Sequence, residues 1–494
     1  MSQSYRDGSR PVHVIGGGIA GLVAAITAAE AGAPVTLHEA SARVGGRALG
    51  RTSWAGVNLG PHVVLTDGAL IRWLRSQGIT IGLSRPTWHG LRVLGDESTG
   101  ASALVPLRLA SNVVARPAPT GESFRLWSDR VFGPRRSELM CRLAGMFTFH
   151  HDPGTLSAQF VWDRYRRLFI HPDRIRMVAG GWSALAQALA DRAVACGVRI
   201  EAGDKVTADE FPGGPAVIAT QLPAASRLLG RQLSWPGART ALLDVVAIPG
   251  RRDWPSIVMD ICGDLRTCCL IDRMTATFPG MLGSPDADLF QAQLGVDPDT
   301  TRTDAVARIE RTFDEAAGEW RNRIVWQRSL ILTDATGAVD PPGATWRDRP
   351  AIDQGDDRFL AGDAVAAPGW LSEVAVNSGV DAARRALEAR RQRVFAPGWP
   401  TAELTPARRL TVLAAVLPGA SVVTADHPDG EIRPWCRDPA DQTGTGYRLV
   451  MRAGVLHGEA PSPHPGGPAT VLAWSRLPGR AGRLLSRWLA RHWQ

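Results

Sequence analysis

The first residues of chemical interest are three glycines and one acid near the N-terminus. Gly16, Gly18 and Gly21 stand in a G-x-G-x-x-G pattern, and Glu39 follows eighteen residues after the last glycine. Gly16 permits a tight turn, Gly18 leaves the backbone open to a pyrophosphate, and Gly21 lets a helix approach a strand closely. A carboxylate at this distance accepts hydrogen bonds from ribose hydroxyls. The spacing therefore predicts that the chain binds a dinucleotide.

This pattern needs a strand and a helix to position it. The buried run 12–15 predicts a strand, and the alanine-rich stretch 19–31 predicts the helix that follows. A second strand is expected over 34–38 and leads directly to the acid. Ile19 and Ala20 open the helix, where free N–H groups and the positive end of the helix dipole favour phosphate.

The sequence beyond the acid narrows the cofactor. Glu39-Ala40 is followed, after four residues, by Gly45-Gly46-Arg47. This segment resembles the flavin amine oxidase and phytoene desaturase superfamily. The resemblance implies that the cofactor is FAD, that the Gly-Gly-Arg stretch with Gly46 wraps the pyrophosphate and the flavin edge, and that Arg47 lies near the phosphates.

A short segment after this stretch is also similar to the family. Asn58-Leu59-Gly60-Pro61-His62 resembles the Asp-Leu-Gly-Pro-His segment whose backbone passes the flavin ring, and Asn58 departs from the family's aspartate. The resemblance thus implies that Pro61 and His62 lie beside the flavin. His62 is the best candidate by position for a polar group there, and a structural hydrogen bond is an equally good interpretation.

Later segments continue the resemblance. Gly362-Asp363 is similar to the C-terminal Gly-Asp motif, whose aspartate binds the ribityl chain or a phosphate-linked hydroxyl. Leu371 and Ser372 open a final helix whose N-terminus, in the family, points at the pyrimidine carbonyl of the flavin and stabilises negative charge on it. Val206 is similar to the valine whose backbone holds the adenine.

The catalytic residues are unknown from the sequence, because no acid–base pair can be assigned. Many flavin amine oxidases resemble one another in a lysine that holds water near the flavin N5. Lys205 is the only lysine of this chain, and it falls at the adenine end. Arginine cannot replace that lysine as a titratable group. No metal is expected, since metal-ligand spacing is not found.

The resemblance covers residues 11 to about 390, and segments 160–182 and 367–371 are more similar to the phytoene-dehydrogenase-related branch. It therefore favours an FAD-dependent oxidoreductase that desaturates or oxidises a hydrophobic or secondary-metabolite substrate by hydride transfer to flavin N5. One alternative is an amine or amino-acid oxidase of the same superfamily. Another, of a different class, is an FAD-containing non-redox enzyme or binding component.

The composition is that of a soluble globular protein, with 44% hydrophobic and 21% charged residues. The net charge of +8 comes from arginines scattered along the chain, which argues against nucleic-acid binding. The uncharged stretch 11–29 resembles a secretory signal or membrane span, but its glycine spacing favours the nucleotide unit. The six cysteines form no C-x-x-C pair, which fits a reduced, cytoplasmic protein.

A length of 494 residues predicts two or three domains. We expect an α/β fold with a discontinuous Rossmann-type FAD-binding domain over 11–75, 160–235 and 345–392. The insertions 76–159 and 236–344 are expected to form a substrate domain in which helices cap a mixed sheet. The second insertion has strand-like runs at 240–248, 256–262 and 267–271 and a helical stretch at 303–319.

Residues 401–494 form a C-terminal extension of unknown role. From residue 478 onward, arginines lie on one side of an expected helix. Apolar residues recur at helical spacing on the opposite side: Ala481, Leu484, Leu485, Trp488 and Leu489. Two arrangements of this basic amphipathic helix are compatible with the sequence. The commoner one is packing against its own domain, and the other is binding to an anionic membrane surface. The second arrangement would place the protein at the periphery of a membrane.

Overall fold

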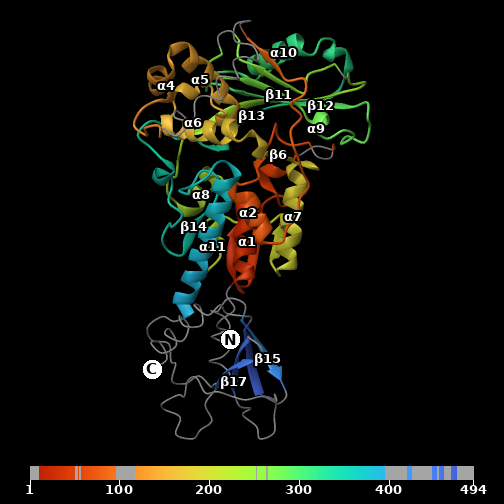
Figure 1. The fold of residues 1–494 in the computed structure, drawn as a ribbon. Coiled ribbons are helices and arrows are strands. Elements are labelled where there is room, and N and C mark those ends of the chain that lie inside the picture. The colour runs from red at the N-terminus through yellow and green to blue at the C-terminus, as the bar shows by residue number, and fades with distance from the viewer. Residues whose placement is uncertain are drawn as a thin grey trace.

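The structure is a computed structural model. It describes residues 11–50, 54, 57–95, 117–251, 253–262, 265–394, 420–425, 448–452, 455–460 and 469–474. These residues form a parallel sheet with its helices and, above it in Figure 1, a second sheet with a separate set of helices. The expected combination of a Rossmann-type domain with a second, mixed-sheet domain is confirmed.

A five-stranded parallel sheet forms the base of the nucleotide unit. Its order is β14 (Arg358–Leu360), β8 (Ala216–Ile218), β1 (Val12–Ile15), β2 (Val35–Glu39) and β7 (Arg199–Ala202). All four pairings are parallel. The strands come from three distant parts of the chain, so the carboxyl ends of early, middle and late segments meet at one edge of the sheet.

Helices pack closely around this sheet (Figure 1). They are α1 (Ile19–Glu30), α2 (Ala69–Ser76), α7 (Gly181–Ala195), α8 (Leu222–Leu229) and α11 (Ser372–Val394). Helix α1 is alanine-rich because it packs against both α7 and α11. A Cβ on Gly379 of α11 would lie 2.6 Å from the carbonyl oxygen of Ala20, which shows how closely these two backbones approach. The strand–helix–strand unit expected from the glycine pattern is confirmed to within a residue at each end.

The second sheet has six strands, and only β10 and β5 pair in parallel. In order they are β13 (Ile324–Ala338), β9 (Gly237–Ala247), β12 (Asp288–Gly295), β11 (Cys269–Arg273), β10 (Ile257–Asp260) and β5 (Arg92–Leu94). The short helix α9 (Met274–Thr277) follows β11.

Both faces of the second sheet are covered, so β9 is buried almost throughout. Leu243 and Val245 pack in one core with α10 (Arg302–Ala316). Leu242, which points the other way, meets the loop at Gly60. That loop belongs to the segment expected beside the flavin, so this sheet face lies over the nucleotide unit.

Three helices form a further core beside the sheet. They are α4 (Phe124–Phe132), α5 (Pro134–Thr148) and α6 (Ala158–Tyr165), and their aromatic side chains pack together with β10. The predicted domain boundaries stay a prediction, since α6 packs with this core although its residues border the segment expected to begin at 160.

Two smaller sheets complete the described residues. One joins β3 (Val64–Leu65), β6 (Ile175–Val178) and β4 (Leu83–Ser84). The other lies in the C-terminal extension and has the order β15 (Ala420–Ala425), β18 (Ala469–Trp474), β17 (Val455–Ala460) and β16 (Arg448–Arg452). The expected amphipathic helix after residue 478 lies outside the described residues. Among the helices that the structure describes, none has the length and apolarity to cross a membrane.

A buried ion pair joins the second sheet to the nucleotide unit. Arg328 of β13 donates from Nε to Asp244 of β9 at 2.9 Å, and it also donates to the backbone carbonyls of Gly50 and Asn58. Gln291 of β12 donates to both Asp244 and the Asn58 carbonyl, at 3.0 Å each. Asp244 is fully buried. These contacts fix the sheet face over the loop that precedes Gly60.

We expect Asp244→Asn to destabilise the folded protein by about 3 kcal/mol, because it leaves the Arg328 charge without its carboxylate in a mostly buried site. Urea unfolding of the two proteins measures the difference. The matched control is Asp353→Asn, which removes the same charge from an exposed pair with Arg385 and should change stability by less than about 0.5 kcal/mol. Equal effects at both positions would contradict a linking role for Asp244.

Candidate functional site

The glycines of the first turn divide into two kinds. Gly16 has a φ of +105°, and a Cβ there would lie 2.6 Å from the carbonyl oxygen of Ala219. A Cβ on Gly21 would lie 1.9 Å from the Gly16 carbonyl oxygen, so these two glycines are required by packing. Gly18 differs, because a Cβ there would meet nothing within 4 Å. Its open side is where a pyrophosphate would approach the backbone.

The N-terminus of α1 faces the same opening. Gly18 is the N-cap, and no side chain caps the helix. The N–H groups of the first turn, which includes Ile19 and Ala20, therefore have no side-chain acceptor and offer donors and a positive dipole end to an anion. This arrangement fits the diphosphate of a dinucleotide.

Glu39 is held at the tip of β2. It is 8% exposed and accepts hydrogen bonds from the backbone N–H groups of Gly17 at 2.7 Å and Ser41 at 2.8 Å. Ser41 in turn accepts from Gly203 at 2.9 Å, which brings in the loop that carries Val206. Ala40 is exposed beside the acid. The expected ribose and adenine residues are thus neighbours, and their roles stay predictions.

The Gly-Gly-Arg stretch lies directly against the glycine turn. The N–H of Gly45 donates to the Gly17 carbonyl at 2.7 Å, and a Cβ on Gly46 would lie 3.2 Å from Cα of Gly18. Arg47 then forms an ion pair with Asp363, with Nη2 and Oδ1 2.8 Å apart. The Asp363 carboxylate raises the pKa of Arg47. The residues expected to hold FAD from the two ends of the chain are therefore joined by one ion pair.

The start of α11 is held in an unusual backbone conformation. Leu371 has a φ of +51°, which costs energy for a residue other than glycine or asparagine. The first-turn residue Glu373 accepts from the N–H groups of Trp370 at 3.0 Å and Ala69 at 3.1 Å, and Arg167 donates to it at 2.7 Å. This carboxylate fixes the turn that precedes Ser372, so the helix N-terminus is aimed rigidly.

The Gly-Asp motif is tied to the same helix. Gly362 donates from its N–H to Oγ of Ser378 at 2.9 Å, and this hydroxyl donates back to the Gly362 carbonyl at 3.0 Å. A Cβ on Gly362 would meet nothing within 4 Å. The motif therefore presents open backbone beside Asp363, as a bound ribityl chain would need.

The His62 imidazole is buried and held by a backbone carbonyl. Its Nδ1 lies 2.7 Å from the Gly60 carbonyl oxygen, which can only accept, so Nδ1 carries the proton. Burial lowers the pKa of His62, and the nearby Arg47 charge acts in the same direction. The ring centroids of His62 and Trp182 are 5.1 Å apart. Pro61 precedes it in the same loop, and a role of either residue beside a flavin stays a prediction.

Asn58, which replaces the aspartate of the family pattern, has a structural role. Its Oδ1 accepts from the N–H of Trp182 at 2.7 Å, which fixes the first turn of α7. Its carbonyl accepts from the Arg328 network that joins the two domains. Asparagine in place of aspartate therefore keeps the loop anchored, because the amide oxygen of Asn58 accepts the hydrogen bond from Trp182 as a carboxylate would.

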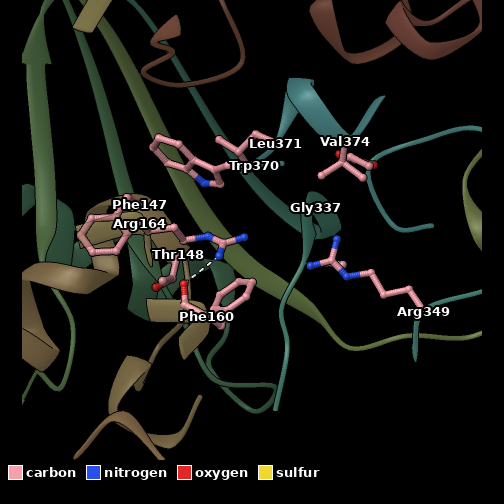
Figure 2. Close-up of a pocket in the computed structure, with 11 residues that line it drawn as sticks. Phe147, Thr148, Phe160, Arg164, Gly337, Arg349, Trp370, Leu371 and Val374 are labelled. Carbon is pink, nitrogen blue, oxygen red and sulfur yellow. Dashed lines mark hydrogen bonds between the residues drawn. The ribbon is translucent and has the colours of Figure 1, made fainter. Parts of the chain in front are cut away.

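A pocket opens beside Asp363 and Leu371, between the nucleotide unit and the aromatic helix core (Figure 2). Its cavity volume is about 10 Å³, which is room for about one water molecule, and the space continues to solvent. Its lining residues are Phe147, Thr148, Phe160, Arg164, Gly337, Ala338, Arg349, Asp363, Trp370, Leu371 and Val374. The pocket thus adjoins both the Gly-Asp motif and the start of α11.

Of the charged residues of this pocket, the sequence identified Asp363 but neither Arg164 nor Arg349. Arg349 forms a two-pronged ion pair with Asp340, at 2.9 Å for each contact, and both residues are buried. Arg164 lies on α6 and is 8% exposed. Phe160, Val161 and Arg164 fall on one face at helical spacing. An arginine within an apolar stripe was the sequence signal that could have indicated a buried, functional side chain.

The comparisons with known proteins agree with this fold. Residues 14–76 match the family of NAD(P)-binding Rossmann-like domains. No curated protein matches the sequence. An oxidoreductase from Methanosarcina mazei has a similar structure, with a TM-score of 0.61 and 15% identity over 75% of this chain and 99% of that one.

Two further solved structures are similar. Cyclohexylamine oxidase from Brevibacterium oxydans has a TM-score of 0.55 and 17% identity, over 76% of this chain and 99% of that one. A putative protoporphyrinogen oxidase from Exiguobacterium has a TM-score of 0.56 and 15% identity, over 77% of this chain and 99% of that one. The chain therefore has the fold of these oxidoreductases, which agrees with the flavin amine oxidase resemblance of the sequence.

The two kinds of glycine predict different outcomes for substitution. Gly18→Leu should leave the free energy of unfolding of the cofactor-free protein within about 0.5 kcal/mol of its normal value, since its φ of −74° suits any residue and its Cβ has room. The same change should weaken FAD binding by about 100-fold or more, because the side chain fills the pyrophosphate position. Equilibrium dialysis with FAD and urea unfolding measure the two quantities.

Gly21→Ala is the matched comparison. Its Cβ would overlap the Gly16 carbonyl, so it should destabilise the cofactor-free protein by about 1–3 kcal/mol. If Gly18→Leu retained normal FAD affinity, the opening at Gly18 would not be the phosphate site.

Proposed function

We propose that this chain is an FAD-dependent oxidoreductase of the flavin amine oxidase superfamily, which oxidises or desaturates a small-molecule substrate with a largely apolar body. The observation that carries the proposal is the pocket that adjoins Asp363 and Leu371, two residues expected to contact the cofactor. It is lined on its other side by Phe147 and Phe160 of the aromatic helix core. A substrate there would lie between the cofactor and an apolar wall.

The residues present fit FAD. The open backbone at Gly18 and the uncapped N-terminus of α1 suit its diphosphate, and Glu39 suits the ribose. Asp363, joined to Arg47, is the residue that we expect to bind a ribityl hydroxyl, and its carboxylate lies beside the open backbone of Gly362. When bound, FAD supplies hydride acceptance at its N5. The rigid N-terminus of α11 would stabilise the negative charge that reduction brings.

Oxidation removes a hydride and a proton from the substrate. Among the residues that line the pocket, the only carboxylate belongs to Asp363, which is already paired with Arg47. The lining therefore binds and orients the substrate and excludes water, and it offers no free base at the reacting carbon. This suits a reaction in which the proton passes to solvent or to a group outside the pocket lining.

An amine or amino-acid oxidase is the second candidate, and the similarity to cyclohexylamine oxidase favours it. Two observations count against an amine substrate. The only lysine of the chain, Lys205, is not among the pocket residues, so the water-holding lysine of many amine oxidases has no counterpart there. Arg164 and Arg349 also line the pocket and would repel a protonated amine.

The test is an anaerobic titration of the FAD-loaded protein with candidate substrates, followed through the visible absorbance of the flavin. We expect bleaching by an apolar substrate with an oxidisable carbon, and none by cyclohexylamine. Readmission of oxygen then separates an oxidase, which recovers its absorbance quickly, from a dehydrogenase. Substrate conversion with a flavin that remains oxidised would support the non-redox alternative, and failure to hold FAD would refute the proposal.

A further inference from the structure

The pocket contains a buried arginine without a carboxylate partner. Arg164 donates from Nη1 to the backbone carbonyl of Phe160 at 2.7 Å, and its Cζ lies 3.3 Å from the centroid of the Phe160 ring. Within the described part of the chain, no carboxylate forms an ion pair with it. Figure 2 shows its guanidinium group reaching toward the middle of the pocket. Most of its N–H donors are therefore available to a ligand.

The surrounding charges do not neutralise Arg164. The nearby Asp340 already accepts from Arg349 with both oxygens, and Asp363 is paired with Arg47. The charges of Asp340 and Asp163 act on Arg164 without an ion pair, and the charges of Arg349 and Arg167 oppose them. Burial lowers the pKa of Arg164 to about 9, and the Arg349 charge adds to that effect. The guanidinium remains protonated at neutral pH, as a buried cation that lacks its counter-ion.

A second donor faces the same space. Trp370 is 7% exposed, and its Nε1 is buried without an acceptor among the described residues. Figure 2 shows this nitrogen on the side of the indole ring that faces Arg164. A buried N–H without a partner is uncommon and calls for an acceptor. Both unsatisfied groups are donors, so the missing partner is an acceptor with negative charge.

We infer that the pocket binds a substrate that carries a carboxylate on an apolar body, with Arg164 and Trp370 holding the carboxylate. The planar guanidinium matches a carboxylate in size and geometry, and the indole N–H adds a third donor. Phe147, Leu371 and Val374 supply the apolar wall for the rest of the molecule. The inference rests on the proposed function, because it assigns the substrate class of the same site.

The experiment compares phenylacetate with phenylacetamide, which have the same shape and differ in charge. Binding to the FAD-loaded protein is measured by isothermal titration calorimetry and by the rise in melting temperature. We expect phenylacetate to bind about 30-fold more tightly or better, since a buried charge pair is lost with the amide. Equal binding of the two compounds, or binding of neither, would overturn the inference.

Three variants test the residues. Arg164→Met should abolish the preference for phenylacetate, and Trp370→Phe should weaken phenylacetate binding by about 10-fold, because one donor is removed. The matched control is Arg347→Met, which removes an exposed positive charge and should leave the preference unchanged. A preference that survives in Arg164→Met would place the carboxylate elsewhere and contradict the assignment.

Two further readouts separate other roles of Arg164. Without ligand, Arg164→Met should melt at the same or a higher temperature, because it removes a buried unpaired charge; a clear fall would indicate a structural role. The FAD affinity and flavin spectrum of the variant should be unchanged, whereas a change without ligand would assign Arg164 to the cofactor. Loss of FAD from the normal protein, or absence of bleaching, would count against the proposed function alone.

Discussion

The ion pair between Arg47 and Asp363 joins two parts of the chain that are 316 positions apart, and the nucleotide site depends on this closure. Asp363 reaches Arg47 only because β14 adds to the sheet beside β8, which itself pairs with β1. Parallel strands end at one edge of a sheet, so the loops after β1, β2 and β14 must meet there. The nucleotide site therefore forms only when the sheet is complete, and neither half of the chain can form it alone.

A buried ion pair holds the second sheet over the nucleotide site. Asp244 and Arg328 are desolvated, and burial raises the pKa of Asp244. Such a pair gives little net stability, and it strongly disfavours arrangements in which one partner is left alone. Its hydrogen bonds to the carbonyls of Gly50 and Asn58 give the sheet one position over the loop that contains Asn58 and Gly60.

The sequence predicted the parts of the site that are local. The turn from Gly16 to Gly21 and the acid at Glu39 follow from spacing within one strand–helix–strand unit. The sequence did not predict the network around Asp244, because its contacts join residues that are distant in sequence. The partners of Arg164 and Arg349 are only four and nine positions away, but nothing in the sequence showed that these arginines are buried beside a pocket. Arg164 lay within a segment noted for its family resemblance, yet its burial depends on how α6 packs against its neighbours. The domain boundaries and the extension after residue 401 are not settled by spacing alone.

The seventeen tryptophans of the chain do not all have the same role. Trp127, Trp162 and Trp320 lie in the packed cores away from the pocket lining, while Trp370 lines the pocket with an unused N–H. The pocket is therefore not uniformly apolar. A pure hydrocarbon would leave both Arg164 and this N–H buried without an acceptor, which is a cost that binding of the apolar body would have to overcome. An amphipathic acid removes that cost, so the polarity of the pocket favours it over a hydrocarbon of the same length.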